Sequence, residues 1–151
     1  MAILVSTDIA VYPKGSARPT GGVGCIAMLI GPNAPVVFDN VRSTFMDHSY
    51  DFYKPNPMVE YPTVDGHQSI EIYLNALRQS YKSFKEKYLN VYGTDASYHD
   101  FSYFAFHTPF SKMVQKSYFA LLLEDIKCNK DSPKYLPELV DQLSPNFEFN
   151  P

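Results

Sequence analysis

His107 combines a side chain that can do chemistry with a position where ligands often bind. It follows the aromatic run of residues 101–106 and precedes a stretch with helical spacing, so it is expected at a strand-to-helix junction. In open α/β sheets, ligands bind at the carboxyl ends of strands. A histidine there can act as a general acid or base, or donate a hydrogen bond to a carbonyl oxygen. The alternative is a capping or core histidine. The other histidines, His48, His67 and His99, fall in segments expected to be solvated loops.

Two lysines just after His107 favour an anionic ligand. Lys112 and Lys116 are four residues apart, which places them on one face of a helix. Like charges at this spacing cost roughly 0.2–0.5 kcal/mol, and a cation in the first turn opposes the helix dipole. This placement is unfavourable for folding, so it indicates an anion-binding role. The alternative is a solvated lysine face.

Three further features carry weaker signals. The glycine-rich residues 15–22 let a ligand approach the backbone, but they lack P-loop spacing and the dinucleotide-binding fingerprint, and taken alone they connect two strands. Asp8 and Asp51 can each orient a catalytic partner or bond a turn. Cys25 falls inside an apolar run, which favours a small core residue over a reactive thiolate. The sequence offers an acid/base group and an anion site but no convincing nucleophile.

Strands come first among the elements that must position these groups. Residues 2–8 predict a short apolar strand buried on both faces, and residues 23–30 predict a second strand. Residues 36–45 predict a third strand. The glycine-containing turn at residues 31–35 would join the second and third strands into an antiparallel hairpin. Residues 46–67 show no clear period, and a loop of this length is usually functional or linking.

Two helices are predicted further along the chain. Residues 68–89 predict an amphipathic helix, because their apolar side chains recur in steps of three and four: Ile70, Tyr73, Leu74, Leu77, Tyr81, Phe84 and Tyr88. The aromatic residues 101–106 predict a strand, and Ser111 is a candidate cap for a helix over residues 112–126. Beyond Lys127 the chain is polar and interrupted by prolines, so it offers little to pack.

Composition narrows the class of protein. The 151 residues are 45% hydrophobic and 19% charged, which is typical of one globular domain, and the 12 prolines exclude a simple helix bundle. A net charge of −3 disfavours a nucleic-acid-binding face. No apolar run is long enough to span a membrane, and the N-terminus does not have the form of a signal peptide. Two distant cysteines make a zinc site unsupported and favour a reduced protein. We expect a soluble, intracellular protein of mixed α and β structure without a metal.

Several strings of residues occur along the chain in an order that matches one known family. They are Asp8-Ile9-Ala10-Val11-Tyr12, Ala17-Arg18-Pro19-Thr20-Gly21-Gly22, Leu29-Ile30-Gly31-Pro32-Asn33-Ala34-Pro35, Tyr50-Asp51-Phe52-Tyr53-Lys54-Pro55, Glu60-Tyr61-Pro62, Val64-Asp65-Gly66, Phe106-His107-Thr108-Pro109-Phe110 and Lys112-Met113-Val114-Gln115-Lys116-Ser117. Over residues 3 to about 126, the sequence resembles the eukaryotic hydroxymethylglutaryl-CoA (HMG-CoA) synthases.

The resemblance implies a thiolase-like α/β fold, in which two similar halves each hold a mixed sheet with flanking helices. It implies that residues 1–35 are the end of the N-terminal region and residues 36–151 the beginning of the C-terminal region. The family condenses acetyl-CoA with acetoacetyl-CoA and water to give HMG-CoA and CoA, a step of the mevalonate pathway. Its CoA thioesters are substrates, so no cofactor is implied. A homodimer is expected when the protein is full length, in the cytoplasm or, alternatively, in mitochondria, with no nucleic-acid or membrane partner.

Residue by residue, the resemblance gives His107 the role of binding and polarising the acetoacetyl thioester. It makes Asp8 and Asp51 supporting acids of the site. Contacts to the CoA substrate are implied at Ser16, Thr20, Ser69, Lys112 and Lys116. Ser16 stands where the family commonly has an asparagine.

Two groups that the family's reaction needs have no match here. The cysteine nucleophile and the glutamate acid/base lie, in the family, upstream of the strand that begins this chain, and Cys25 falls where the family has a small apolar residue. Nucleophilic catalysis needs the nucleophile, so we do not expect this chain alone to complete the condensation. It is therefore either part of a longer synthase or a truncated, non-catalytic relative that binds acyl-CoA or a full-length partner.

Overall fold

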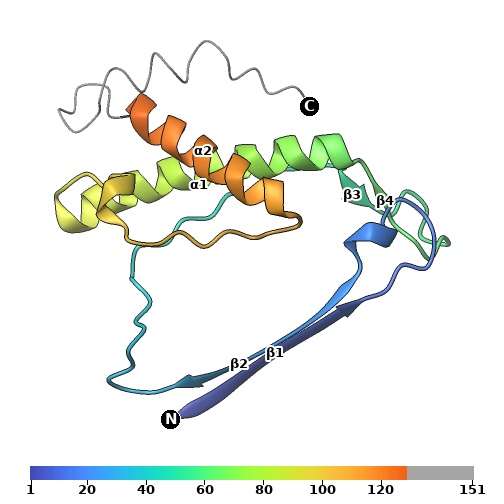
Figure 1. The fold of residues 1–151 in the computed structure, drawn as a ribbon, viewed down its shortest axis with the longest axis horizontal. Helices are drawn as coiled ribbons and strands as arrows, with labels where there is room; N and C mark the ends of the chain where they lie inside the picture. The colour runs from blue at the N-terminus through green and yellow to red at the C-terminus, as the bar shows by residue number, and fades with distance from the viewer. Residues whose placement is uncertain (129–151) are drawn as a thin grey trace. The chain divides into compact units, whose positions relative to one another are not determined.

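The computed structural model describes residues 1–128. The chain divides into two compact units, the first made of Met1–Arg42 and His48–Ser69, the second of Ser43–Asp47 and the chain from Ile70 onward. The elements, in order, are β1 (Ala2–Ala10), η1 (Arg18–Thr20), β2 (Gly22–Ile30), β3 (Phe52–Tyr53), β4 (Thr63–Val64), α1 (Gly66–Tyr92), η2 (Tyr98–Asp100) and α2 (Ser111–Cys128) (Figure 1). The proline-broken segment predicted to offer little to pack lies, past residue 128, outside the described residues.

In the first unit, β1 and β2 form a long antiparallel ribbon (Figure 1). Its register runs from Ala2 opposite Ile30 to Ala10 opposite Gly22. The first two predicted strands are therefore confirmed, but they pair with each other. The predicted third strand at residues 36–45 and its hairpin with the second strand are wrong, because that segment pairs with no strand among the described residues. Without a partner for its backbone groups, an apolar run does not become a strand.

The ribbon exposes apolar side chains on both faces. Side chains alternate between faces along a strand, so Val5 lies on one face and Ile26, opposite Ser6, on the other. Val5 is 59% exposed and Ile26 63% exposed. The prediction that the first strand is buried on both faces is therefore wrong for the described residues, and so is the prediction of a core position for Cys25, which is exposed on β2. A two-stranded ribbon gives a strand only one neighbour and no covering layer.

We expect the chain to associate through this ribbon, because exposed apolar patches of this kind promote self-association. Replacing Val5 and Ile26 together by threonine should shift the chain toward monomer in size-exclusion chromatography with light scattering. Val37→Thr is the matched control, since Val37 is 81% exposed but lies outside the ribbon. A wild-type chain that stays monomeric at high concentration would contradict this prediction.

The loop predicted for residues 46–67 contains one small antiparallel pair, β3 with β4, in which Phe52 lies opposite Val64. Directly after β4, Asp65 caps the start of α1, because its Oδ1 accepts hydrogen bonds from the amides of His67 at 3.1 Å and Gln68 at 3.0 Å. The helix ends at Tyr92, where Gly93 has φ +70° and its amide donates to the carbonyl of Leu89 at 2.8 Å. Both predicted helices are confirmed, with α1 slightly longer than expected.

The core of the second unit forms where α1 meets α2. Leu74 of α1 and Met113 and Ala120 of α2 make a buried cluster, and further α1 side chains pack against it: Ile70, Tyr73 and Leu77. The side chains of α1 that form this core belong to the apolar series predicted from the sequence. The aromatic residues 101–106 are not a strand, although they were predicted to be one. Within the described residues, neither helix has the length and apolar character needed to cross a membrane.

Candidate functional site

His107 lies in the second unit, just ahead of α2, with its side chain exposed. Its carbonyl oxygen accepts a hydrogen bond from the hydroxyl of Tyr73 at 2.9 Å, and the two rings lie with their centroids 6.0 Å apart. The hydroxyl of Thr108 donates a hydrogen bond to the preceding carbonyl, that of Phe106, at 2.9 Å. The backbone around the histidine is thus held by side chains, while neither bond uses a ring nitrogen. An exposed imidazole held in this way can donate a hydrogen bond to a substrate carbonyl.

Both predicted anion-binding lysines lie on α2. Lys112 is the second residue of the helix and is exposed, and Lys116 follows one turn later and is half-buried. The first turn of α2 carries no acidic side chain, so no carboxylate there balances Lys112. His107, Lys112 and Lys116 therefore come from one short stretch of the second unit, in which a loop leads directly into a helix.

In the first unit, the turn after β4 links three of the other predicted residues. The amide of Val64 donates to Oγ of Ser16 at 2.9 Å. The amide of Asp65 donates to the carbonyl of Asp51 at 2.8 Å, and the amide of Ser69 donates to the carbonyl of Asp65 at 3.0 Å. The dipeptide Val64-Asp65 therefore bonds all three of these residues. Ser16 and Val64 meet although 48 residues separate them along the chain.

Asp8 and Thr20 take no part in those hydrogen bonds. Asp8 lies in the middle of β1, opposite Gly24, and shares a shallow hollow with Cys25. The hydroxyl of Thr20 donates to the carbonyl of Ala17 at 2.7 Å, which closes the short helix η1. Asp51 also accepts a hydrogen bond from the hydroxyl of Ser49 at 3.1 Å. These contacts are local, so they fix backbone shape and leave the assignment of Asp8 and Thr20 as predictions.

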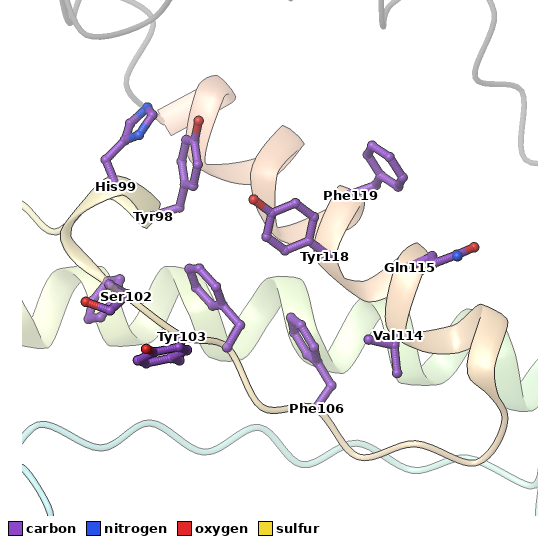
Figure 2. A pocket seen from close by; sticks show the side chains of 11 residues that line it. Tyr98, His99, Ser102, Tyr103, Phe106, Val114, Gln115, Tyr118 and Phe119 are labelled. Carbon is purple, nitrogen blue, oxygen red and sulfur yellow. The ribbon is translucent and has the colours of Figure 1, made fainter.

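An aromatic groove of about 630 Å³ lies between residues 98–106 and the outer face of α2 (Figure 2). Figure 2 shows the rings of Tyr118 and Phe106 on opposite sides of it, and Phe104 makes an edge contact with Tyr118 at 5.8 Å. Burial, and then the nearby Tyr118, raises the pKa of the Tyr98 hydroxyl. No residue predicted for the site lines this groove.

Among the described residues of the second unit, the most buried charged group is the carboxylate of Asp125 on α2, which is fully buried. Its oxygens accept hydrogen bonds from the hydroxyl of Tyr81, from Nζ of Lys85 at 3.1 Å, from Oγ of Ser97 at 3.1 Å and from the amide of Tyr98 at 3.1 Å. The carboxylate thereby joins both long helices to the loop that leads to η2. Buried charges in proteins are paired and hydrogen-bonded in this way.

Lys85 completes this cluster from α1. Its Nζ also donates to the carbonyl of Ala96 at 2.7 Å and lies 3.2 Å from the carboxylate of Asp95. Sequence analysis missed this ion pair, although a signal was present. Lys85 lies four residues after Tyr81, on the apolar face of its helix, and Asp125 lies four residues after Leu121 on the buried face of α2. A charge on an apolar helix face requires a buried partner.

Cys128 is poorly suited to act as a nucleophile. Both Cys25 and Cys128 are free and exposed. Partial burial, and then the charge of Glu124, raises the pKa of the Cys128 thiol. A raised pKa lowers the fraction of reactive thiolate at neutral pH. Among residues 1–128, no group of three or more histidine, cysteine, aspartate or glutamate side chains is arranged to hold a metal ion.

The chain has the α/β fold of the thiolase-like class, because solved HMG-CoA synthase structures resemble it. Residues 36–149 match the family model described as hydroxymethylglutaryl-coenzyme A synthase C terminal, and residues 1–35 match the corresponding N-terminal model. The chain belongs to the hydroxymethylglutaryl-CoA synthase family.

Curated relatives agree with this assignment. The hydroxymethylglutaryl-CoA synthase of Saccharomyces cerevisiae is 48% identical over 153 residues, which cover 95% of this chain and 30% of that protein. The mitochondrial synthase of Homo sapiens is 52% identical over 130 residues, covering 82% of this chain and 26% of its own length. The cytoplasmic synthase of Rattus norvegicus is 47% identical over 139 residues, covering 88% of this chain and 27% of that protein. The chain spans about a third of the length of these relatives.

Solved structures also resemble the chain, and two of them have a bound CoA compound. MvaS in complex with 3-hydroxy-3-methylglutaryl coenzyme A has a TM-score of 0.71 and 31% identity, over 93% of this chain and 35% of the other. An HMG-CoA synthase complexed with CoA has a TM-score of 0.63 and 26% identity, over 83% of this chain and 33% of the other. Both of these neighbours hold CoA or a CoA thioester.

Proposed function

We propose that the chain is part of a synthase that condenses acetyl-CoA with acetoacetyl-CoA and water to give HMG-CoA and CoA. The observation that carries this proposal is the 48% identity with the yeast synthase along 95% of the chain. Within that reaction, His107 donates a hydrogen bond to the ketone carbonyl of the acetoacetyl thioester, the carbonyl that the acetyl group attacks, and stabilises the negative charge that develops on its oxygen. The exposed imidazole and its tethered backbone support this role.

The remaining site residues act on the same substrates. Lys112 and Lys116 bind the phosphates of CoA, and the exposed first turn of α2 supports this role. Ser16, Thr20 and Ser69 contact the CoA thioester, and Asp8 and Asp51 are supporting acids. Bonding of Ser16, Asp51 and Ser69 around the turn after β4 is consistent with a common site for these three.

A second candidate function is a non-catalytic relative that binds acyl-CoA or a full-length partner. The observation that favours it is the raised pKa of the Cys128 thiol, which lowers the fraction of thiolate that this cysteine could offer as a nucleophile. The mass of the natural protein, detected with an antibody against residues 68–90, separates the two. A band near three times 17.2 kDa is expected for the synthase, and a band near 17.2 kDa would favour the non-catalytic relative.

The cellular location and the oligomeric state of the synthase are part of the same proposal. Relatives of the chain include cytoplasmic and mitochondrial synthases, and we assign this one to the cytoplasm. We further propose that the full-length protein is a homodimer that needs no cofactor besides its CoA thioester substrates. Residues 1–35 are its last N-terminal segment, and the C-terminal region begins at residue 36.

Replacing Lys112 or Lys116 by alanine should weaken binding of acetoacetyl-CoA by about fivefold each, because an exposed ion pair contributes up to about 1 kcal/mol. Isothermal titration calorimetry measures the loss. Lys127→Ala is the matched control, since Lys127 is exposed at the far end of α2. The difference between variant and wild type should shrink at high salt. Equal affinities for all three variants would contradict phosphate binding by Lys112 and Lys116.

A further inference from the structure

We infer that Tyr73 is the positioning residue of His107, an inference that rests on the proposed function for its effect on substrate. One side chain makes two contacts with the histidine. The hydroxyl donates to the His107 carbonyl at 2.9 Å, and the phenol ring lies 6.0 Å from the imidazole with a 32° angle between the planes. Aromatic rings attract each other with centroids about 4.5–7 Å apart. The first contact fixes the backbone, and the second restricts the turning of the imidazole.

Tyr73 can hold the histidine because it is itself held. It packs on the buried cluster formed by Leu74, Met113 and Ala120. Met113 is 1% exposed and lies in the first turn of α2, shortly after His107. One core cluster therefore supports both the tyrosine and the helix that follows the histidine. Packing on this cluster limits the movement of Tyr73, the residue to which the His107 carbonyl is bonded.

The geometry leaves the imidazole free for chemistry. Tyr73 bonds the carbonyl of His107 and not its ring, so Nδ1 and Nε2 are not used by this bond. Thr108 bonds the preceding carbonyl, that of Phe106. A hydrogen-bond donor to a substrate must be held within a narrow range of orientation to be effective. Tyr73 supplies that restriction without taking the donor.

The test uses the 151-residue chain, labelled with ¹³C and ¹⁵N, with the substitutions Tyr73→Phe and Tyr73→Leu. Tyr73→Phe removes the hydroxyl and keeps the ring, so the carbonyl carbon resonance of His107 should shift while its ring-proton resonances change little. Tyr73→Leu removes both contacts, so both sets of resonances should move. If Tyr73 only stabilised the fold, both variants would lower stability, and the carbonyl and ring-proton resonances of His107 would not respond separately. Thermal unfolding of each variant is measured alongside.

Tyr103→Phe is the matched control, because Tyr103 is 93% exposed and lies four residues before His107. It removes one phenol hydroxyl and should leave the resonances of His107 in place. If Tyr73→Phe and Tyr73→Leu also leave them in place, the inference is overturned.

Titration with HMG-CoA separates this inference from the proposed function. In the wild-type chain, HMG-CoA should shift the imidazole resonances of His107, and Tyr73→Leu should raise the Kd about fivefold. If HMG-CoA shifts no resonance of His107 while the Tyr73 variants do, the proposed function fails and the positioning role stands. If HMG-CoA binds with the same Kd to wild type and Tyr73→Leu, the positioning role fails and the proposed function stands.

Discussion

Replacing Asp125 by alanine is expected to lower the free energy of unfolding by about 3–5 kcal/mol, the usual effect of breaking a buried ion pair. The fully buried carboxylate accepts hydrogen bonds from Tyr81, Lys85, Ser97 and Tyr98. Each buried donor that loses its acceptor costs about 1–3 kcal/mol. Since whole domains are stable by about 5–15 kcal/mol, this single change should remove a large part of the stability.

Urea unfolding followed by circular dichroism measures this effect. Lys127→Ala is the matched control, because Lys127 is exposed on the same helix as Asp125, so its loss should cost at most about 0.5 kcal/mol. The double substitution Lys85→Met with Asp125→Leu removes both charges, so it should regain the part of the loss that comes from the unpaired ammonium, while the hydroxyls of Tyr81 and Ser97 still lose this acceptor. An Asp125→Ala chain with the wild-type urea midpoint would show that the ion pair does not support the fold.

Replacing His107 by alanine should lower the rate of HMG-CoA formation by about 10²–10³, the range expected when one hydrogen-bond donor to a developing oxyanion is removed. Because this chain has no matched nucleophile, the measurement uses a chimaera in which it replaces the matching stretch of the yeast synthase. The yeast part supplies the rest of the enzyme, and the present chain supplies His107 and the lysines. Loss of acetoacetyl-CoA absorbance reports the reaction.

Two comparisons make this experiment decisive. His99→Ala removes a second exposed histidine from the same segment of chain and should leave most of the activity. An inactive chimaera with the unaltered sequence, if it folds like the yeast enzyme, would contradict the synthase proposal and favour a non-catalytic relative. An active chimaera that tolerates His107→Ala would keep the synthase and remove His107 from the reaction.

The helices were predictable because their spacing alone decides which face packs. The apolar steps from Ile70 to Tyr88 predicted α1, and the structure buries Leu74 and Tyr81 from that series. Lys85 was not predicted to be buried, because helical periodicity identifies a face and not the partner across it. Its partner Asp125 comes from another helix, 40 residues later.

Strands were less predictable, because a strand exists only where a second backbone pairs with it. Residues 36–45 and 101–106 carry apolar and aromatic side chains typical of strands, yet neither is paired within the described residues. The residues of the site were also predictable only where the signal was local in the sequence. A loop histidine before a helix could be selected from the sequence, but its contact with Tyr73 joins positions 34 residues apart and needed the fold.

The order in which the ribosome makes the chain gives the β1–β2 ribbon a further consequence. Both strands end by Ile30, whereas α1 begins at Gly66. At about 5–20 residues per second, the intervening stretch takes roughly 2–7 s to synthesise. A hairpin closes in about 1–10 μs, so the ribbon has time to form long before either helix emerges. We therefore expect chaperones that bind apolar segments to reach the two exposed faces of this ribbon before either helix has been synthesised.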